Sequence, residues 1–154
     1  MDLIEELKRV VDGMRRERLP YAVCGGIALA VHGFPRFTKD IDLLVRRSDV
    51  ERMLRVVRKM GYRVSAGSMT LHRGRRNETT IHRVSKFVGE EFVTLDLVEV
   101  SPALMSVWKQ RERHRWEGRV IQVVSAGGLA RMKRAAGRKQ DLADLEKLKG
   151  GSAE

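Results

Sequence analysis

The sequence contains one cysteine, few aromatic residues and no long apolar run. Cys24 has no partner for an internal disulfide, which is typical of proteins of a reducing cytoplasm. No apolar stretch approaches the roughly 20 residues that span a bilayer, and the acidic N-terminus lacks the apolar core of a signal peptide. Because only 5% of the residues are aromatic, Leu, Val, Ile, Met and Ala must fill the interior. These features predict a cytoplasmic protein with an aliphatic core.

Internal repeats, low-complexity segments and interdomain linkers are also absent from the sequence. A chain of 154 residues suits one domain, and a hydrophobic fraction of 42% is sufficient for a packed core. We therefore expect a single domain over residues 1–149. The sequence Gly-Gly-Ser-Ala-Glu over residues 150–154 predicts a disordered tail.

Basic residues outnumber acidic residues by 31 to 20, which gives a formal net charge of +11. Such a surface attracts polyanions such as RNA, DNA, nucleotides or acidic membranes. The alternative is that the excess charge mainly keeps a small protein soluble, and charge alone does not decide between the two. Two basic stretches are candidates for contact with a nucleic-acid backbone, although each alone is better explained as a solvated surface. They contain Arg73, Arg75 and Arg76, and Lys109, Arg111, Arg113 and Arg115.

The spacing of apolar residues predicts a mixed α/β or α+β domain. The expected strands are Tyr21–Cys24, Asp40–Val45, Tyr62–Val64, Met69–His72, Thr79–Val84, Phe92–Val98 and Val120–Val124. Three helices are expected over Leu3–Met14, Ile27–His32 and Val50–Met60, the last of them capped by Ser48 or Asp49. A fourth helix is expected to start at Ser101-Pro102, and a fifth to be capped by Ser125. A last helix contains Leu142, Leu145 and Leu148.

Three aspartates carry the strongest chemical signal. Asp40 and Asp42 are two apart on an expected strand and therefore project from the same face. Adjacent carboxylates repel each other unless a cation or proton intervenes, and Mg²⁺ commonly binds one or two carboxylates together with substrate phosphates. Asp96 lies in another apolar strand, where an unpaired carboxylate is costly. Beside the first pair, it would complete a two-metal site that activates a hydroxyl and stabilises a leaving pyrophosphate.

Each aspartate also has an ordinary structural explanation. Asp40 can cap a turn, Asp42 can be a charge at a strand edge, and Asp96 can be a salt-bridge partner. The glycine pair Gly25-Gly26 favours the metal site, because bare backbone amides between a strand and a helix can receive phosphate. We therefore predict a site in which Asp40, Asp42 and Asp96 bind Mg²⁺ or Mn²⁺ and act in catalysis.

These residues, in this order, resemble the nucleotidyltransferase-fold superfamily, which includes DNA polymerase β. That family pairs a Gly-Gly or Gly-Ser turn with an Asp-x-Asp on the following strand and takes a third acidic residue from a later strand. The segments 25–29 and 36–42 are most similar to those of the abortive-infection (type IV) toxin nucleotidyltransferases and of small stand-alone bacterial and archaeal relatives. The resemblance implies a nucleotidyltransferase fold, in which helices pack on a mixed β-sheet.

The same resemblance implies an enzyme that transfers a nucleoside monophosphate from an NTP to an acceptor hydroxyl. It implies nucleotide contacts from Gly25, Gly26, Arg36, Thr38, Lys133 and Arg138. Lys133 would contact the triphosphate, and Arg138 would steady phosphate or Asp144. The alternative for these two cations is an ordinary charged helix face.

The acceptor is less well defined by the sequence. The positive charge favours RNA, for example the end of a tRNA, whereas a protein side chain or an aminoglycoside or lincosamide antibiotic stays open. The chain ends soon after Leu148, where larger relatives carry a helical domain that helps to bind the acceptor. This favours a helical partner protein, such as the antitoxin of a toxin–antitoxin pair. The other hypothesis is a non-catalytic module that binds RNA or a protein, which the intact Asp40-Ile41-Asp42 motif disfavours.

The histidines and the cysteine carry no such signal. His32, His72, His82 and His114 lack a spacing typical of metal ligands. We therefore expect His32 to pack on its helix and the others to lie at the surface or in hairpins. Cys24 has no activating neighbour in sequence and is expected in the core.

Overall fold

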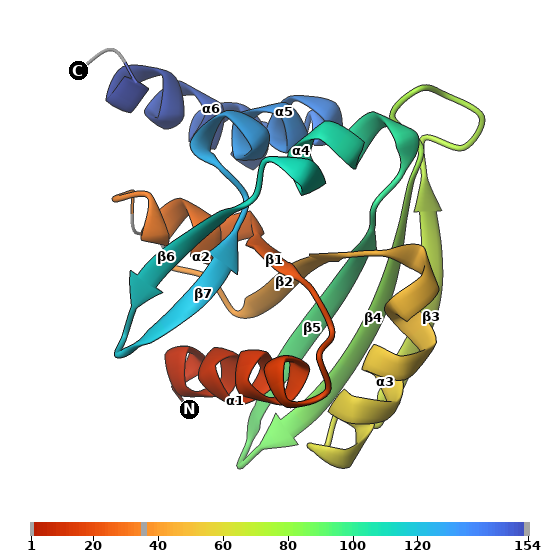
Figure 1. The fold of residues 1–154 in the computed structure, drawn as a ribbon. Helices are drawn as coiled ribbons and strands as arrows, with labels where there is room; N and C mark the ends of the chain where they lie inside the picture. Colours follow the sequence, from red (N-terminus) through yellow and green to blue (C-terminus); the bar gives the residue numbers. More distant parts are fainter. Residues whose placement is uncertain (1, 35–36, 153–154) are drawn as a thin grey trace.

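The computed structural model describes residues 2–34 and 37–152, and within them seven strands form one mixed sheet (Figure 1). The strands are β1 (Ala22–Cys24), β2 (Asp40–Val45), β3 (Val64–Leu71), β4 (Thr79–Val88), β5 (Glu91–Glu99), β6 (Glu112–Trp116) and β7 (Arg119–Val123). Their order across the sheet is β3-β4-β5-β2-β1-β7-β6. β2 pairs in parallel with β5, and β1 with β7, whereas the remaining neighbours are antiparallel. The mixed sheet confirms the predicted fold class.

Helices pack on both faces of this sheet. They are α1 (Leu3–Arg16), α2 (Gly25–Val31), α3 (Val50–Lys59), α4 (Met105–Lys109), α5 (Ala126–Ala136) and α6 (Lys139–Ser152), with 3-10 turns over Arg47–Asp49 and Pro102–Leu104. Figure 1 shows α5 and α6 at the end of the molecule away from α1. Lys86 of β4 points toward α1, since its Nζ lies 2.6 Å from Glu6 Oε1. No helix in the described part of the chain is long and apolar enough to cross a membrane.

The interior is aliphatic, as the shortage of aromatic residues predicts. Leu7, Met14, Leu29, Ile41 and Leu43 are fully buried, and the core also includes Cys24. Alternation along β2 turns Ile41 and Leu43 into this core. The same alternation directs Asp40 and Asp42 to the opposite face of the sheet.

Helix ends follow local side-chain chemistry. Ser125 caps α5 as predicted, because its hydroxyl accepts a hydrogen bond from the Gly128 amide at 3.0 Å. Asp49 precedes α3 but bonds to Arg46 in place of a helix amide. At the other end of the chain, α6 includes residues 150–152, which the sequence places in a disordered tail, while residues 153 and 154 lie outside the described residues.

Two strands differ from the prediction. β3 is continuous over Val64–Leu71, although its Ser- and Gly-rich middle suggests a break; the chain accommodates this middle with a register shift between Ser65 and Gly67. β6 falls in a stretch expected to be a solvated basic segment. It pairs with β7 through a two-residue turn at Glu117-Gly118, where both residues have positive φ, as in a type I′ hairpin. Charged side chains are tolerated on β6 because it is an edge strand.

Candidate metal and nucleotide site

Four neighbouring strands place one residue each in a row across the sheet. Asp42 of β2 is the register partner of Cys24 on β1 and of Asp96 on β5, and Asp96 is in turn the partner of Arg83 on β4. Register partners on adjacent strands share a face, and Asp40 shares it too because it is two residues from Asp42. The structure therefore places the three predicted aspartates on one face. The parallel pairing of β2 with β5 produces this arrangement.

The three carboxylates influence one another's ionisation. Burial, followed by the charges of Asp96 and Asp40, raises the pKa of Asp42 to about 7. Burial and Asp96 also raise the pKa of Asp40, although its side chain is exposed. Carboxylates crowded in this way need a cation or proton for compensation. Their oxygen atoms are the ligands that Mg²⁺ and Mn²⁺ prefer, so the donor set fits a divalent cation.

Arg83 is a site residue that the sequence analysis missed. Its Nε donates to Asp96 Oδ1 at 2.8 Å and its Nη2 to Asp96 Oδ2 at 2.9 Å, a two-pronged pair that fixes the orientation of the carboxylate. Each carboxylate oxygen keeps a second lone pair, so Asp96 can still accept another contact. An arginine in a half-polar strand is common. Only the register of β4 against β5 distinguishes this one.

Gly25 lies against the carboxylate of Asp42. Its φ is +68°, and a Cβ built there would come within 2.1 Å of Asp42 Oδ2. A side chain at this position would therefore both strain the backbone and collide with the carboxylate. The close approach accounts for the glycine and sets the first turn of α2, where Gly26 is buried, beside the acidic residues.

Lys133 and Arg138 contact acidic residues of α6. Lys133 Nζ lies 2.9 Å from Asp144 Oδ2 and 3.4 Å from Asp141 Oδ1, and all three side chains are buried. Arg138 Nε lies 2.7 Å from Asp141 Oδ2, so Arg138 pairs with Asp141, whereas the sequence suggested Asp144. Both cations lower the pKa of Asp42 and are thus close enough to act electrostatically on the carboxylates.

The other predicted residues have smaller roles in this geometry. The hydroxyl of Thr38 lies 3.4 Å from the backbone nitrogen and 3.4 Å from the carbonyl oxygen of Asp40, at the entrance to β2. Arg36 lies outside the described residues. Burial and the nearby charge of Asp42 raise the pKa of the Cys24 thiol well above its usual value. The thiol is therefore protonated and serves as a core residue, as predicted.

Comparisons with known proteins agree with this architecture. TM1012 of Thermotoga maritima, assigned as a nucleotidyltransferase, superposes with a TM-score of 0.67 at 15% identity, over 94% of this chain and 91% of that one. The lincosamide antibiotic adenylyltransferase LnuA, solved with lincomycin, gives 0.64 at 14% identity over 94% and 95%. JHP933 of Helicobacter pylori gives 0.51 at 19% identity, over 94% of this chain and 63% of that one. At such identities the likeness shows the fold.

Sequence comparison identifies the family. No curated protein matches the sequence. A family profile, described as "Uncharacterised nucleotidyltransferase", matches residues 1–126, a range that includes the glycine turn and all three aspartates. The chain therefore belongs to this nucleotidyltransferase family and is a transferase enzyme.

Proposed function

We propose that the protein uses Mg²⁺ or Mn²⁺ to transfer a nucleoside monophosphate from an NTP to an acceptor hydroxyl, with release of pyrophosphate. The observation that carries the proposal is the pKa of Asp42, which burial and two neighbouring carboxylates raise to about 7. This side chain is unfavourable in its ionised form until a cation joins it. A divalent cation held there would supply Lewis-acid chemistry: it would neutralise phosphate charge and make the attacking hydroxyl more acidic.

The acidic residues divide the work in this proposal. Asp40 and Asp42 hold the cation through their carboxylate oxygens. Arg83 holds the carboxylate of Asp96 in a fixed orientation through two hydrogen bonds, so that Asp96 can accept the proton of the attacking hydroxyl. In this scheme Asp40 and Asp42 bind the cation, and Asp96, which Arg83 of β4 orients, assists the nucleophile.

The basic residues would bind the triphosphate in different ways. The backbone amides of Gly25 and Gly26 lie beside the carboxylates and donate to phosphate. Arg138 is 78% exposed, so its guanidinium can reach a phosphate although Nε and Nη2 donate to Asp141. Lys133 is only 6% exposed and is paired with two carboxylates, so it acts through its charge.

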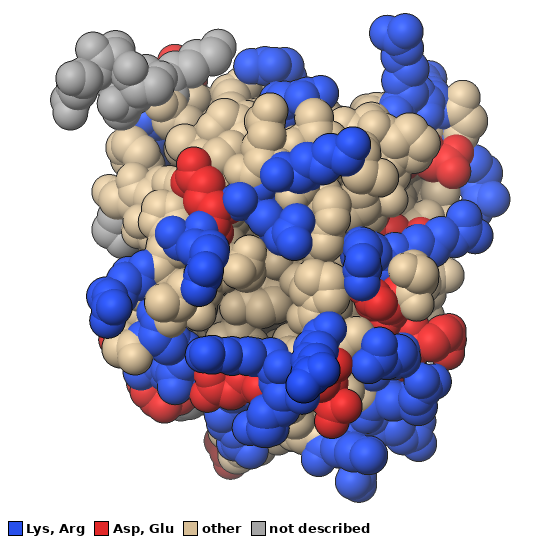
Figure 2. Space-filling model, viewed as in Figure 1, with Lys and Arg blue, Asp and Glu red and all other residues tan. Residues whose placement is uncertain are grey.

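The charge of the molecule and the position of its exposed arginines support one acceptor class. The net charge is +11, and Lys and Arg side chains cover much of the face shown in Figure 2. The exposed arginines of the β3–β4 turn, Arg73, Arg75 and Arg76, lie beside α5, because Asn77 Nδ2 donates to the Ala135 carbonyl at 3.1 Å. A basic surface next to the helices that border the site favours a polyanionic acceptor, and we infer RNA. It disfavours polycationic aminoglycosides, whose charge it would repel.

The test is transfer of label from α-labelled NTPs to total RNA, lincomycin or tobramycin in the presence of Mg²⁺. Three proteins are compared: wild type, Asp42→Asn, and Asp12→Asn as the matched control. Asp12 lies on α1, away from the site, and pairs with Arg119 of β7. We expect wild type and Asp12→Asn to label RNA, and Asp42→Asn to lose about a hundredfold or more in rate.

Each other outcome has a definite meaning. Label in an antibiotic but not in RNA would contradict RNA as the acceptor but would still support the proposed transfer reaction. Equal rates for Asp42→Asn and wild type would contradict the role of the carboxylates. An absence of transfer from every NTP to every acceptor would contradict the proposed reaction.

A further inference from the structure

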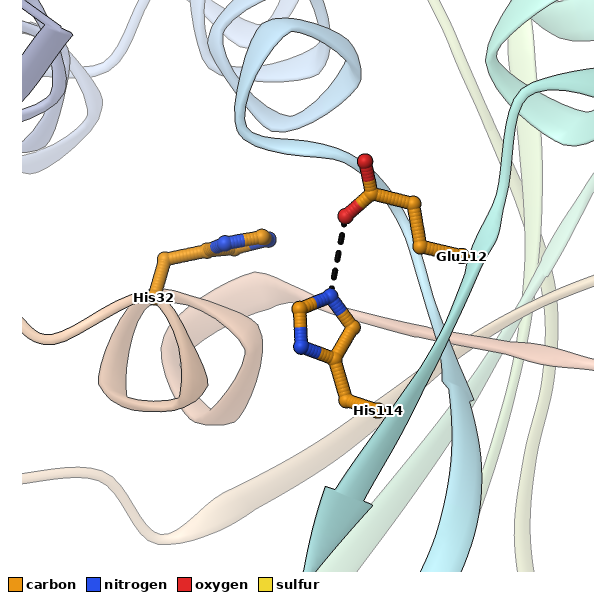
Figure 3. Close-up of side chains that lie close together, drawn as sticks. All are labelled: His32, Glu112 and His114. Atoms are coloured by element: carbon orange, nitrogen blue, oxygen red, sulfur yellow. Dashed lines mark hydrogen bonds and ion pairs between the residues drawn. The ribbon is translucent and has the colours of Figure 1, made fainter.

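Three side chains from two distant segments meet beside the edge strand β6 (Figure 3). One ring nitrogen of His32, one of His114 and one carboxylate oxygen of Glu112 all lie within 4.8 Å of one another. Glu112 and His114 are two apart on β6 and share a face, while His32 directly follows α2. Sequence spacing gives no sign of this cluster. It forms because β7 pairs with β1 and thereby brings β6 over the end of α2.

Hydrogen bonds set the imidazoles in a form suited to a cation. His32 Nε2 lies 2.8 Å from the Val124 carbonyl oxygen, which can only accept, so Nε2 donates this hydrogen bond and Nδ1 is the nitrogen through which a neutral imidazole would bind a cation. Metal-binding histidines commonly make such a bond to a backbone carbonyl with their other nitrogen. His114 Nε2 lies 2.9 Å from Glu112 Oε1, and the two share a proton that a cation can replace. The two rings meet edge to face, with centroids 5.4 Å apart.

The donor set distinguishes this cluster from the aspartates. Two imidazoles and one carboxylate suit Zn²⁺ and similar transition metals, whereas Mg²⁺ prefers oxygen ligands in octahedral geometry. Zn²⁺ with three protein ligands keeps a fourth position for water. The cluster is also separate in space, because α2 lies between His32 and the carboxylate that Gly25 touches. A helix of this length spans about 10 Å.

We propose that His32, His114 and Glu112 bind a Zn²⁺ ion that fastens the β6–β7 hairpin to α2. The ion joins an edge strand to elements that border the carboxylates. α2 begins at Gly25 against Asp42, and Val124, which His32 contacts, precedes the cap of α5. The ion therefore acts as a structural clip behind the site. It takes no part in binding the NTP.

The test is Zn²⁺ binding, measured by equilibrium dialysis and metal analysis in excess Mg²⁺. We expect one equivalent bound to wild type. His114→Ala and Glu112→Gln should weaken binding by more than about tenfold, since even the loss of an outer-shell partner costs that much. His82→Ala is the matched control: His82 also pairs with a glutamate, Glu99, at 2.6 Å, but outside the cluster, so this variant should bind like wild type.

Two further measurements separate this site from the aspartates and from misfolding. Asp42→Asn should retain Zn²⁺, and Co²⁺ should give the visible spectrum of a four-coordinate imidazole site in wild type but not in His114→Ala. Zn²⁺ should also raise the Tm of wild type and His82→Ala and leave that of Glu112→Gln unchanged. Glu112 is 47% exposed, so its replacement by glutamine leaves the core intact. Absence of Zn²⁺ binding by wild type, or equal binding by His114→Ala, would overturn the proposal.

Discussion

At the scale of single residues, the site is governed by close approaches that the strand register imposes. Only glycine fits at position 25, because the Asp42 carboxylate occupies the space that a Cβ would need. Arg83 donates hydrogen bonds to Asp96 because the two residues are cross-strand partners. Neither contact involves neighbours in sequence. The aspartates can be recognised from their motif, whereas the arginine that orients one of them can be found only once β4 and β5 are paired.

Asp42 should make the metal-free protein less stable as the pH rises. Its pKa in the folded chain, about 7, lies above the ordinary value near 4, so the folded state holds an extra proton between these values. Stability therefore falls as the pH rises from about 4 to 7, and the destabilisation is complete above 7. We expect Asp42→Asn to raise the Tm at pH 8 without Mg²⁺, but to have little effect at pH 4. Thermal melts at both pH values measure this.

Mg²⁺ and a control variant sharpen that prediction. The cation should stabilise wild type at pH 8 more than at pH 5, since it binds the ionised carboxylate, and should have little effect on Asp42→Asn. Asp12→Asn, which alters a surface ion pair, should behave like wild type. The same Tm difference between wild type and Asp42→Asn at both pH values would show that the ionisation of Asp42 is not the cause.

At the scale of elements, α6 is joined to the domain through buried charges. Lys133 of α5 is paired with Asp141 and Asp144, while Leu145 and Leu148 supply the buried apolar contacts. The sequence pattern of α6 predicts the helix and its leucines. It gives no indication that the lysine expected at the triphosphate is enclosed by the aspartates of the next helix.

Lys133→Met should destabilise the protein by about 3–5 kcal/mol, because it removes the buried cation that pairs with Asp144 and that shares Asp141 with Arg138. Arg9→Met serves as the control: Arg9 is 64% exposed and lies 3.7 Å from Glu6, so we expect a change below about 1 kcal/mol. Urea denaturation of both variants at pH 7 gives the two values. A loss of NTP affinity in Lys133→Met with unchanged stability would instead favour a direct contact with the triphosphate.

Also at the scale of elements, local sequence signals predict individual strands and helices but not how the strands pair. Apolar spacing and the Asp-x-Asp motif predict the strand at Asp40 and the helix at Val50, because those signals are local. β6 is missed because its charged residues look like a solvated segment, although the turn at Glu117-Gly118 is a detectable hairpin signal. The pairing of β2 with β5 and of β1 with β7 depends on contacts between distant segments, which no local pattern specifies.

At the scale of the whole molecule, the basic surface is the feature that points to a partner. The arginines of the β3–β4 turn are exposed beside α5, and a second exposed group, Arg52, Arg55 and Arg58, lies on α3. Lys and Arg are dense over α3 at the lower right of Figure 2. These two groups carry the same charge in different places, which makes them a matched pair.

Replacing the three turn arginines, Arg73, Arg75 and Arg76, with glutamine should weaken RNA binding more than the same change on α3. Each lost phosphate contact reduces the magnitude of the slope of log K against log salt concentration by about 1. For the turn variant this magnitude should therefore fall by up to about 3. NTP affinity should stay the same in both. RNA titrations by fluorescence anisotropy at several salt concentrations give the slopes, and equal losses in the two variants would indicate non-specific attraction.

The row of paired residues across β1, β2, β5 and β4 restricts how the chain can change in length. Because alternate residues of a strand face opposite sides, one residue inserted in the middle of β2 or β5 would turn an acidic side chain into the aliphatic interior and an aliphatic one out of it. Point substitutions do not change which side of the sheet each residue faces. Insertions and deletions among relatives should therefore gather in connections such as the β3–β4 turn, and any alignment that opens a gap inside these strands is misaligned.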